Sequence, residues 1–154
     1  MPVVPSELGH LTHETLQRND DQTAECWSWN DALHSVQDHP SVVVYDRYGR
    51  IIEKQWHTHG QRHRDGDQPA WIKEGVKLYY KTNELHREGG PAWVGKGTEK
   101  WYKHGQLHRL DGPSIITEDR VLWHIEGQHY TLQQWGDDPR TDNELFTWFK
   151  LLYG

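Results

Sequence analysis

The sequence predicts a mainly β fold, in which tandem β-hairpin repeats form a sheet with a helical cap at each end. Aromatic residues, turn residues and His-Arg pairs recur about every 22 residues along the middle of the chain. Only 34% of the residues are hydrophobic, yet nine are Trp and seven are Tyr, and such flat rings suit a thin sheet. The predicted organisation is an acidic helical cap over residues 1–42, the hairpin array over 43–130 and a second helical cap over 131–154.

Three copies of the repeat align on their His-Arg pairs, which are His63-Arg64, His86-Arg87 and His108-Arg109. In each copy, an aromatic strand meets a turn, a short strand returns through the His-Arg pair, and a second turn ends at Pro. A fourth, degenerate copy begins at Trp123, and a half copy spans 45–49. We expect positive φ angles at the first turns, since Gly and Asn tolerate them best. These turn residues are Gly60, Asn83, Gly105 and Gly127.

The two flanking segments have apolar residues at helical spacing, whereas residues 43–130 do not. A helix is expected over 24–36, followed by a stop at Asp38-His39-Pro40, and a shorter one is possible around 6–17. A third is expected over 142–153, where Thr141 and Glu144 have the capping-box pattern. These helices would pack on the two ends of the array or together on one face of it.

The third copy, from Trp101 to Ser114, reads Trp-Tyr-x-x-Gly-x-x-His-Arg-x-Asp-Gly-Pro-Ser. It resembles a repeat of bacteriophage and large DNA virus proteins that has Ala in the last position, and it is similar to the MORN repeat, whose units are also β-hairpins. The resemblance covers residues 43–130, with departures at Thr82-Asn83, at 88–90 and in the fourth copy. It implies a MORN-like sheet and a viral origin but no chemistry. MORN arrays are associated with protein and lipid contacts, which here is analogy alone.

The net charge of −6 is concentrated near the start of the chain. Residues 1–42 contain seven acidic residues against Arg18, whereas residues 43–154 are neutral overall, which argues against nucleic-acid binding by the acidic segment. The single cysteine, Cys26, excludes an internal disulfide. Since neither a membrane-spanning stretch nor a secretion signal is visible, we expect a cytoplasmic protein, in the host cytoplasm if a phage encodes it.

Reactive groups do not gather into a catalytic pattern. The His-Arg pair recurs in every copy, whereas a catalytic site is needed once, and no Ser or Cys has an evident base partner. His57, His59 and His63 could gather as zinc ligands, but the other copies hold Tyr or Thr at most of these positions and no Cys lies nearby. We therefore predict no enzymatic activity, no metal site and no cofactor.

The aromatic pairs Tyr79-Tyr80 and Trp101-Tyr102 point instead to binding. Strand alternation would turn one ring of each pair to solvent unless the caps cover that face. Within each His-Arg pair, one side chain would stack on a ring of an adjacent unit and the other would pair with an acidic turn residue. The predicted partner-binding residues are Tyr80, Tyr102, His86, Arg87, His108 and Arg109.

These observations favour a non-enzymatic protein-binding module. The first hypothesis is a phage accessory protein that binds a host protein, such as a defence complex, and inhibits it sterically. The alternatives are a virion or assembly component and an acidic mimic of nucleic acid. No membrane partner and no direct nucleic-acid contact are expected, and the sequence leaves the oligomeric state open.

Overall fold

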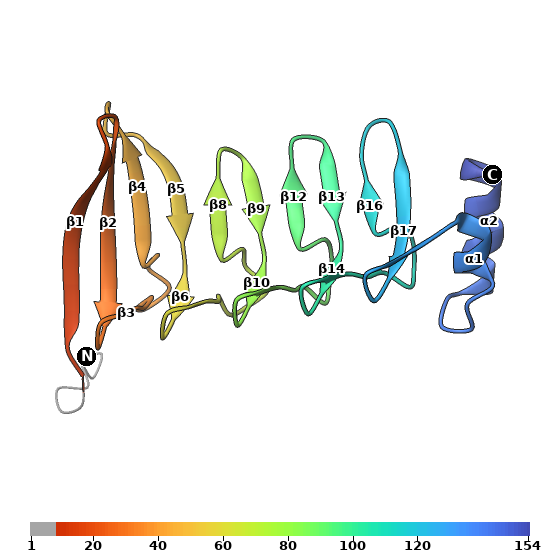
Figure 1. Ribbon diagram of the computed structural model, residues 1–154, viewed down its shortest axis with the longest axis horizontal. Coiled ribbons are helices and arrows are strands. Elements are labelled where there is room, and N and C mark those ends of the chain that lie inside the picture. Colours follow the sequence, from red (N-terminus) through yellow and green to blue (C-terminus); the bar gives the residue numbers. More distant parts are fainter. Residues whose placement is uncertain (1–8) are drawn as a thin grey trace.

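A computed structural model describes residues 9–154 as one long antiparallel sheet with two helices beyond its last strand (Figure 1). The strands follow the chain order β1-β2-β4-β5-β8-β9-β12-β13-β16-β17-β18, and β3 pairs with β2. The strands of this sheet are β1 Leu11–Asn19, β2 Gln22–Trp29, β3 Ala32–Leu33, β4 Val42–Asp46, β5 Ile51–Gln55, β8 Trp71–Lys73, β9 Val76–Leu78, β12 Trp93–Gly95, β13 Thr98–Lys100, β16 Ile115–Ile116, β17 Val121–Ile125 and β18 Gln128–Tyr130. The predicted mainly β, hairpin-rich architecture is confirmed.

Three small hairpins form a second row beside one end of the strands of this sheet (Figure 1). They pair β6 (His57–Thr58) with β7 (Gln61–Arg62), β10 (Tyr80–Lys81) with β11 (Glu84–Leu85), and β14 (Tyr102–Lys103) with β15 (Gln106–Leu107). The turn of each small hairpin donates a backbone N–H to the preceding unit; Gly105, for example, donates to the Leu85 carbonyl at 2.9 Å. Successive repeats are therefore joined along two rows, the long sheet and the small hairpins.

The predicted left-handed turns are confirmed. Gly105 has φ +75° and follows His104 at φ +49°, while Asn83 has φ +68° after Thr82 at φ +49°. Two consecutive positive φ angles define the type I′ turn, whose twist matches that of the strands that it joins.

A small buried residue follows the proline that ends each of four repeat units. These residues are fully buried and are Ser41, Ala70, Ala92 and Ser114. The carbonyl of each accepts a 2.8 Å hydrogen bond from the backbone N–H of an aromatic residue, the four donors being Trp27, Trp56, Tyr79 and Trp101. A further copy of the repeat therefore begins at Trp27, upstream of the predicted array.

The prediction of an N-terminal helical cap was wrong. Residues 24–36 form most of β2 and all of β3, and residues 11–17 of the second proposed helix lie in β1; residues 6–8 lie outside the described residues. Asn30 and Asp31 have φ angles of +48° and +62°, which make a hairpin turn and cannot occur within an α-helix. The helical spacing of the apolar residues was coincidental.

The C-terminal cap is helical, as predicted, although its details differ. Helix α2 spans Asn143–Tyr153, and its N-cap is Asp142 rather than Thr141. An additional short helix, α1 (Leu132–Gly136), begins with a capping box formed by Thr131 and Gln134. Both helices lie beyond the last strands and not over the middle of the sheet (Figure 1).

The two hydrophobic clusters lie near opposite ends of the array. At the C-terminal end, Trp123 and Ile125 of β17 pack with Trp135 of α1 and Phe149 of α2. At the N-terminal end, Ala24, Val42 and Val44 form the second cluster. The single-layered middle depends on contacts between successive repeats.

Candidate functional site

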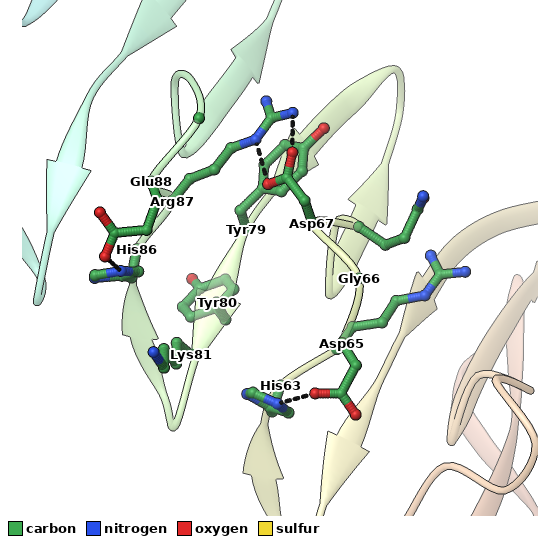
Figure 2. Close-up of a pocket in the computed structure, with 13 residues that line it drawn as sticks. His63, Asp65, Gly66, Asp67, Tyr79, Tyr80, Lys81, His86, Arg87 and Glu88 are labelled. Atoms are coloured by element: carbon green, nitrogen blue, oxygen red, sulfur yellow. Dashed lines mark hydrogen bonds and ion pairs between the residues drawn. The ribbon is translucent and has the colours of Figure 1, made fainter.

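A groove of about 470 Å³ lies between two successive repeats in the middle of the array. One side comes from the loop that follows β7, and the other comes from the β10–β11 hairpin and the loop after it. Figure 2 shows His63 and Asp65 on the first side, His86 and Glu88 on the second, and Tyr80 between them. We call this region, lined by residues 63–68, 79–81 and 86–89, the inter-repeat groove.

Arg87 lies at the top of the groove and is held by three different groups. Its guanidinium is 3.8 Å from the centroid of the Tyr79 ring. It also donates two hydrogen bonds to Asp67, at 2.8 and 2.9 Å, and one to the carbonyl of Pro91, at 3.3 Å. The hydrogen bonds from Arg87 lower the pKa of Asp67, so this charged pair persists well below neutral pH. We call the arrangement of ring, carboxylate and proline carbonyl around one arginine the arginine clamp.

The arginine clamp recurs in the neighbouring repeats. Arg64 stacks on Trp56 at 3.9 Å and donates two 2.7 Å hydrogen bonds to Asp38, which belongs to the preceding repeat, as Asp67 does for Arg87. Arg109 stacks on Trp101 at 3.9 Å but pairs with Asp111 of its own repeat. The difference has a simple cause, because the position that would supply the carboxylate from the preceding repeat is Gly89.

Both ring nitrogens of His86 are engaged, one with the following repeat and the other with its own repeat. Its Nδ1 accepts the backbone N–H of His104 at 3.1 Å, so the ring proton is on Nε2, which donates to Glu88 at 2.9 Å. His34 and His108 accept backbone N–H groups of the following unit in the same way. His86 is buried, and its ring is fixed in one orientation.

His63 departs from this pattern. Its Nε2 lies 3.0 Å from Asp65, but its buried Nδ1 has no hydrogen-bond partner among the described residues. At this junction the side chain of Asn83 accepts the backbone N–H of Arg62 instead, at 2.6 Å. The lining of the groove therefore contains one buried nitrogen that has no hydrogen-bond partner among the described residues.

Tyr80 and Tyr102 occupy equivalent positions in successive repeats. The guanidinium of Arg62 lies 5.1 Å from the Tyr80 ring and 4.6 Å from the Trp71 ring. Tyr102 is half-buried, and this burial raises its pKa, with a smaller contribution from Tyr80 nearby. Tyr79 lines the same groove as Tyr80, because the chain leaves the sheet between β9 and β10 and strict strand alternation ends there.

Three of the six predicted binding residues line the inter-repeat groove, namely Tyr80, His86 and Arg87. Tyr102, His108 and Arg109 occupy the same positions one repeat later and are not part of it. The expectation for the His-Arg pair needs correction, since the arginine both stacks on a ring and pairs with an aspartate, and the ring belongs to its own repeat. Sequence reasoning missed Asp67, although Asp38, Asp67 and Asp111 all stand two residues before a proline.

The electrostatics of the groove are balanced. Arg64, Lys81 and Arg87 are offset by Asp65, Asp67 and Glu88, and the side chains of Asp65 and Glu88 remain 99% and 76% exposed. The exposed carboxylates and Lys81 can therefore pair with charges of either sign, while the rings offer flat apolar surface.

The three histidines considered as zinc ligands point to different partners. His57 hydrogen-bonds Ser41 at 2.8 Å, the His59 ring packs on His34 at 4.7 Å, and His63 pairs with Asp65. Across residues 9–154, no group of three or more His, Cys, Asp or Glu side chains is placed to hold a metal ion.

Comparison with known proteins returned no matching family model, no matching curated protein and no matching solved structure. No helix in the described part of the chain is long and apolar enough to cross a membrane.

Proposed function

We propose that this chain is a protein-binding repeat scaffold that engages a polypeptide through the inter-repeat groove. The observation that carries the proposal is that the groove is lined from two repeats by side chains already fixed in place. Arg87 has four polar or aromatic contacts, and both ring nitrogens of His86 are engaged. Side chains ordered before binding lose little conformational entropy when a partner arrives, which favours affinity.

The chemistry of the groove favours a polypeptide partner of mixed character. Aromatic rings and arginine dominate the binding energy of protein interfaces, and here they are bordered by carboxylates and one lysine of opposite charge. Such a surface can bind a loop that presents an apolar or aromatic side chain between charged ones.

Steric inhibition of a host protein is the form of binding that we propose, with the chain acting in the cytoplasm. Cys26 is a free thiol, which suits a reducing compartment.

The support for a phage origin is the repeat pattern alone. We do not propose mimicry of nucleic acid by acidic helices, because the described part of the acidic segment contains strands β1 to β3 and no helix.

Two equivalent lysines provide a sharp test. Lys81 lines the groove, whereas Lys103 occupies the same exposed position one repeat later and does not. Tagged chains carrying Lys81→Glu or Lys103→Glu would be used to purify partners from cells that encode the protein, with quantitative mass spectrometry. We expect Lys81→Glu to reduce recovery of a specific partner about tenfold or more, and Lys103→Glu to have little effect.

Equal recovery by both variants would contradict binding at the groove. Failure of the unmodified chain to retain any protein at micromolar bait concentration would contradict the protein-binding function itself.

A further inference from the structure

We propose that strand β1 is a self-association edge, through which two copies of this chain pair antiparallel about Leu16 and join their sheets into one. This inference does not depend on the proposed function, because the inter-repeat groove and β1 lie in different parts of the array (Figure 1).

Only one end of the sheet offers a long open edge among the described residues. β1 is the terminal strand, has nine residues, and pairs with β2 alone in this part of the chain. Its side chains are almost all exposed, including Leu11 at 46% and Leu16 at 47%. The opposite end finishes in the three-residue β18, which is followed by α1 and α2. Long, exposed edge strands pair readily with other strands.

The sequence of β1 is complementary to itself around Leu16. In an antiparallel pair centred on this residue, Leu16 faces its own copy and Glu14 faces Arg18 of the second copy. The twofold symmetry makes this contact twice. The charges of β1 are therefore complementary to those of β1 in a second copy of the chain.

The three side chains lie on the same face of the sheet. Glu14 and Leu16 are two residues apart in a strand, and so point the same way. Arg18 sits at a bulge, but it contacts Glu53 at 3.3 Å, and Glu53 is in register with Val44, Ala24 and Leu16 across β5, β4, β2 and β1. The two charge pairs would flank the two leucines on one face.

The charges of the edge are available for this contact. Glu14 has no ion pair among the described residues, and Arg18 shares Glu53 with Lys73, whose Nζ is 3.4 Å from the same oxygen. Arg18 could therefore turn to a second copy and leave Glu53 paired. Leu16 would continue the row of Ala24 and Val44 from the N-terminal hydrophobic cluster across the twofold axis.

The geometry predicts a closed, weak dimer. Because the other end of the sheet is closed, pairing through β1 stops at two copies instead of continuing into a fibre. A single pair of strands buries an area at the low end for protein interfaces, so we expect a dissociation constant in the micromolar range or weaker.

Sedimentation equilibrium of the full chain over a range of concentrations tests the proposal, with three substitutions. Glu14→Lys and Arg18→Glu each replace two attractive pairs by two repulsive ones, so each is expected to weaken the dimer about tenfold or more. When these two variants are mixed, the introduced lysine of one chain faces the introduced glutamate of the other, and the remaining native Arg18 faces the remaining native Glu14. A heterodimer should therefore form where neither homodimer does. Leu16→Lys, which puts two cations on the axis, should also dissociate the dimer.

The matched control is Lys96→Glu. It disrupts an exposed ion pair, in which Lys96 Nζ lies 3.9 Å from a Glu74 carboxylate oxygen. Because this pair is not part of β1, the substitution should leave the dimer unchanged. A chain that stays monomeric up to millimolar concentration would overturn the proposal. So would a dimer that survives Leu16→Lys, or variants that fail to form the heterodimer on mixing. Circular dichroism would confirm that each variant retains its strands.

Discussion

At the scale of single residues, each arginine clamp concentrates several contacts on one side chain. The guanidinium of Arg87 covers the Tyr79 ring, pairs with Asp67 of the preceding repeat and holds the Pro91 carbonyl, while its side chain is 19% exposed. Partial burial strengthens both the cation–π contact and the ion pair relative to exposed examples. The same residue stabilises one repeat internally and joins it to its neighbour.

Replacing Arg87 by Ala is expected to lower the free energy of unfolding by about 1–2 kcal/mol, through loss of the ring contact and the two-point ion pair. Arg50 is the matched control, since it also contacts a ring, Tyr48, and an aspartate, Asp46, but is 74% exposed. Arg50→Ala should change stability by less than about 0.5 kcal/mol. Chemical denaturation of both variants measures the difference, and equal effects would show that the clamp contributes no more than an exposed pair.

At the scale of elements, the type I′ turns set the register of the array. Gly105 has open space around the position of a Cβ, the nearest atom being the Glu84 Cβ at 4.0 Å, so its requirement is the positive φ of +75° rather than lack of room. Its backbone N–H also joins β14–β15 to Leu85 of the preceding hairpin. Backbone conformation and inter-repeat contact therefore depend on one position.

Substitution of Gly105 by Ala is expected to lower the free energy of unfolding by about 1 kcal/mol, because an L-residue with a Cβ is strained in the left-handed region. Gly105→Asn should cost clearly less, since Asn83 occupies the equivalent position with φ +68° in the preceding repeat. Thermal or chemical denaturation of the two variants provides the comparison. An Asn variant as unstable as the Ala variant would mean that a contact, and not the φ angle, decides the residue here.

Sequence reasoning located these elements where the period of the repeat is regular and lost them where it is not. The turns from Gly60 to Gly127 follow the period of 22 or 23 residues, but Trp27 precedes Trp56 by 29 because the β4–β5 hairpin between them is longer. That irregular interval concealed a repeat in a segment whose apolar spacing also suits a helix. The pairing of Arg87 with Asp67 was out of reach for another reason, since it depends on how folded repeats stack.

At the scale of the whole molecule, the array has hydrophobic clusters near its ends and polar connections between its repeats. Several of these connections require neutral histidine. Burial, together with the charge of Arg62, lowers the pKa of His57 to about 4, and burial also lowers the pKa of His34, His108 and His124. Protonation would remove the acceptor nitrogens by which His34 and His108 hold the next repeat.

Stability should therefore fall in acid. Because the folded-state pKa of His57 lies below the unfolded value of about 6.5, the unfolded chain binds protons first as the pH drops. The contribution of neutral His57 to the free energy of unfolding is thus fully present above pH ~6.5. It decreases towards pH ~4, by about 3 kcal/mol from His57 alone. Denaturation at a series of pH values should show this slope for the unmodified chain and a smaller one for His57→Asn. The exposed control His10→Asn should keep the full slope. If the His57→Asn profile were identical to the His10→Asn profile, His57 would not be a source of the loss of stability in acid.

The central claim is that the inter-repeat groove is the surface that meets a partner polypeptide. Site-specific photo-cross-linking tests it most directly, with a benzophenone amino acid placed at Lys81 in one chain and at Lys103 in another. Both positions are exposed and equivalent in the repeat, but only Lys81 lines the groove. The account predicts a discrete cross-linked partner from position 81 and little or none from position 103. Cross-links of equal yield from the two positions, or from position 103 alone, would contradict it.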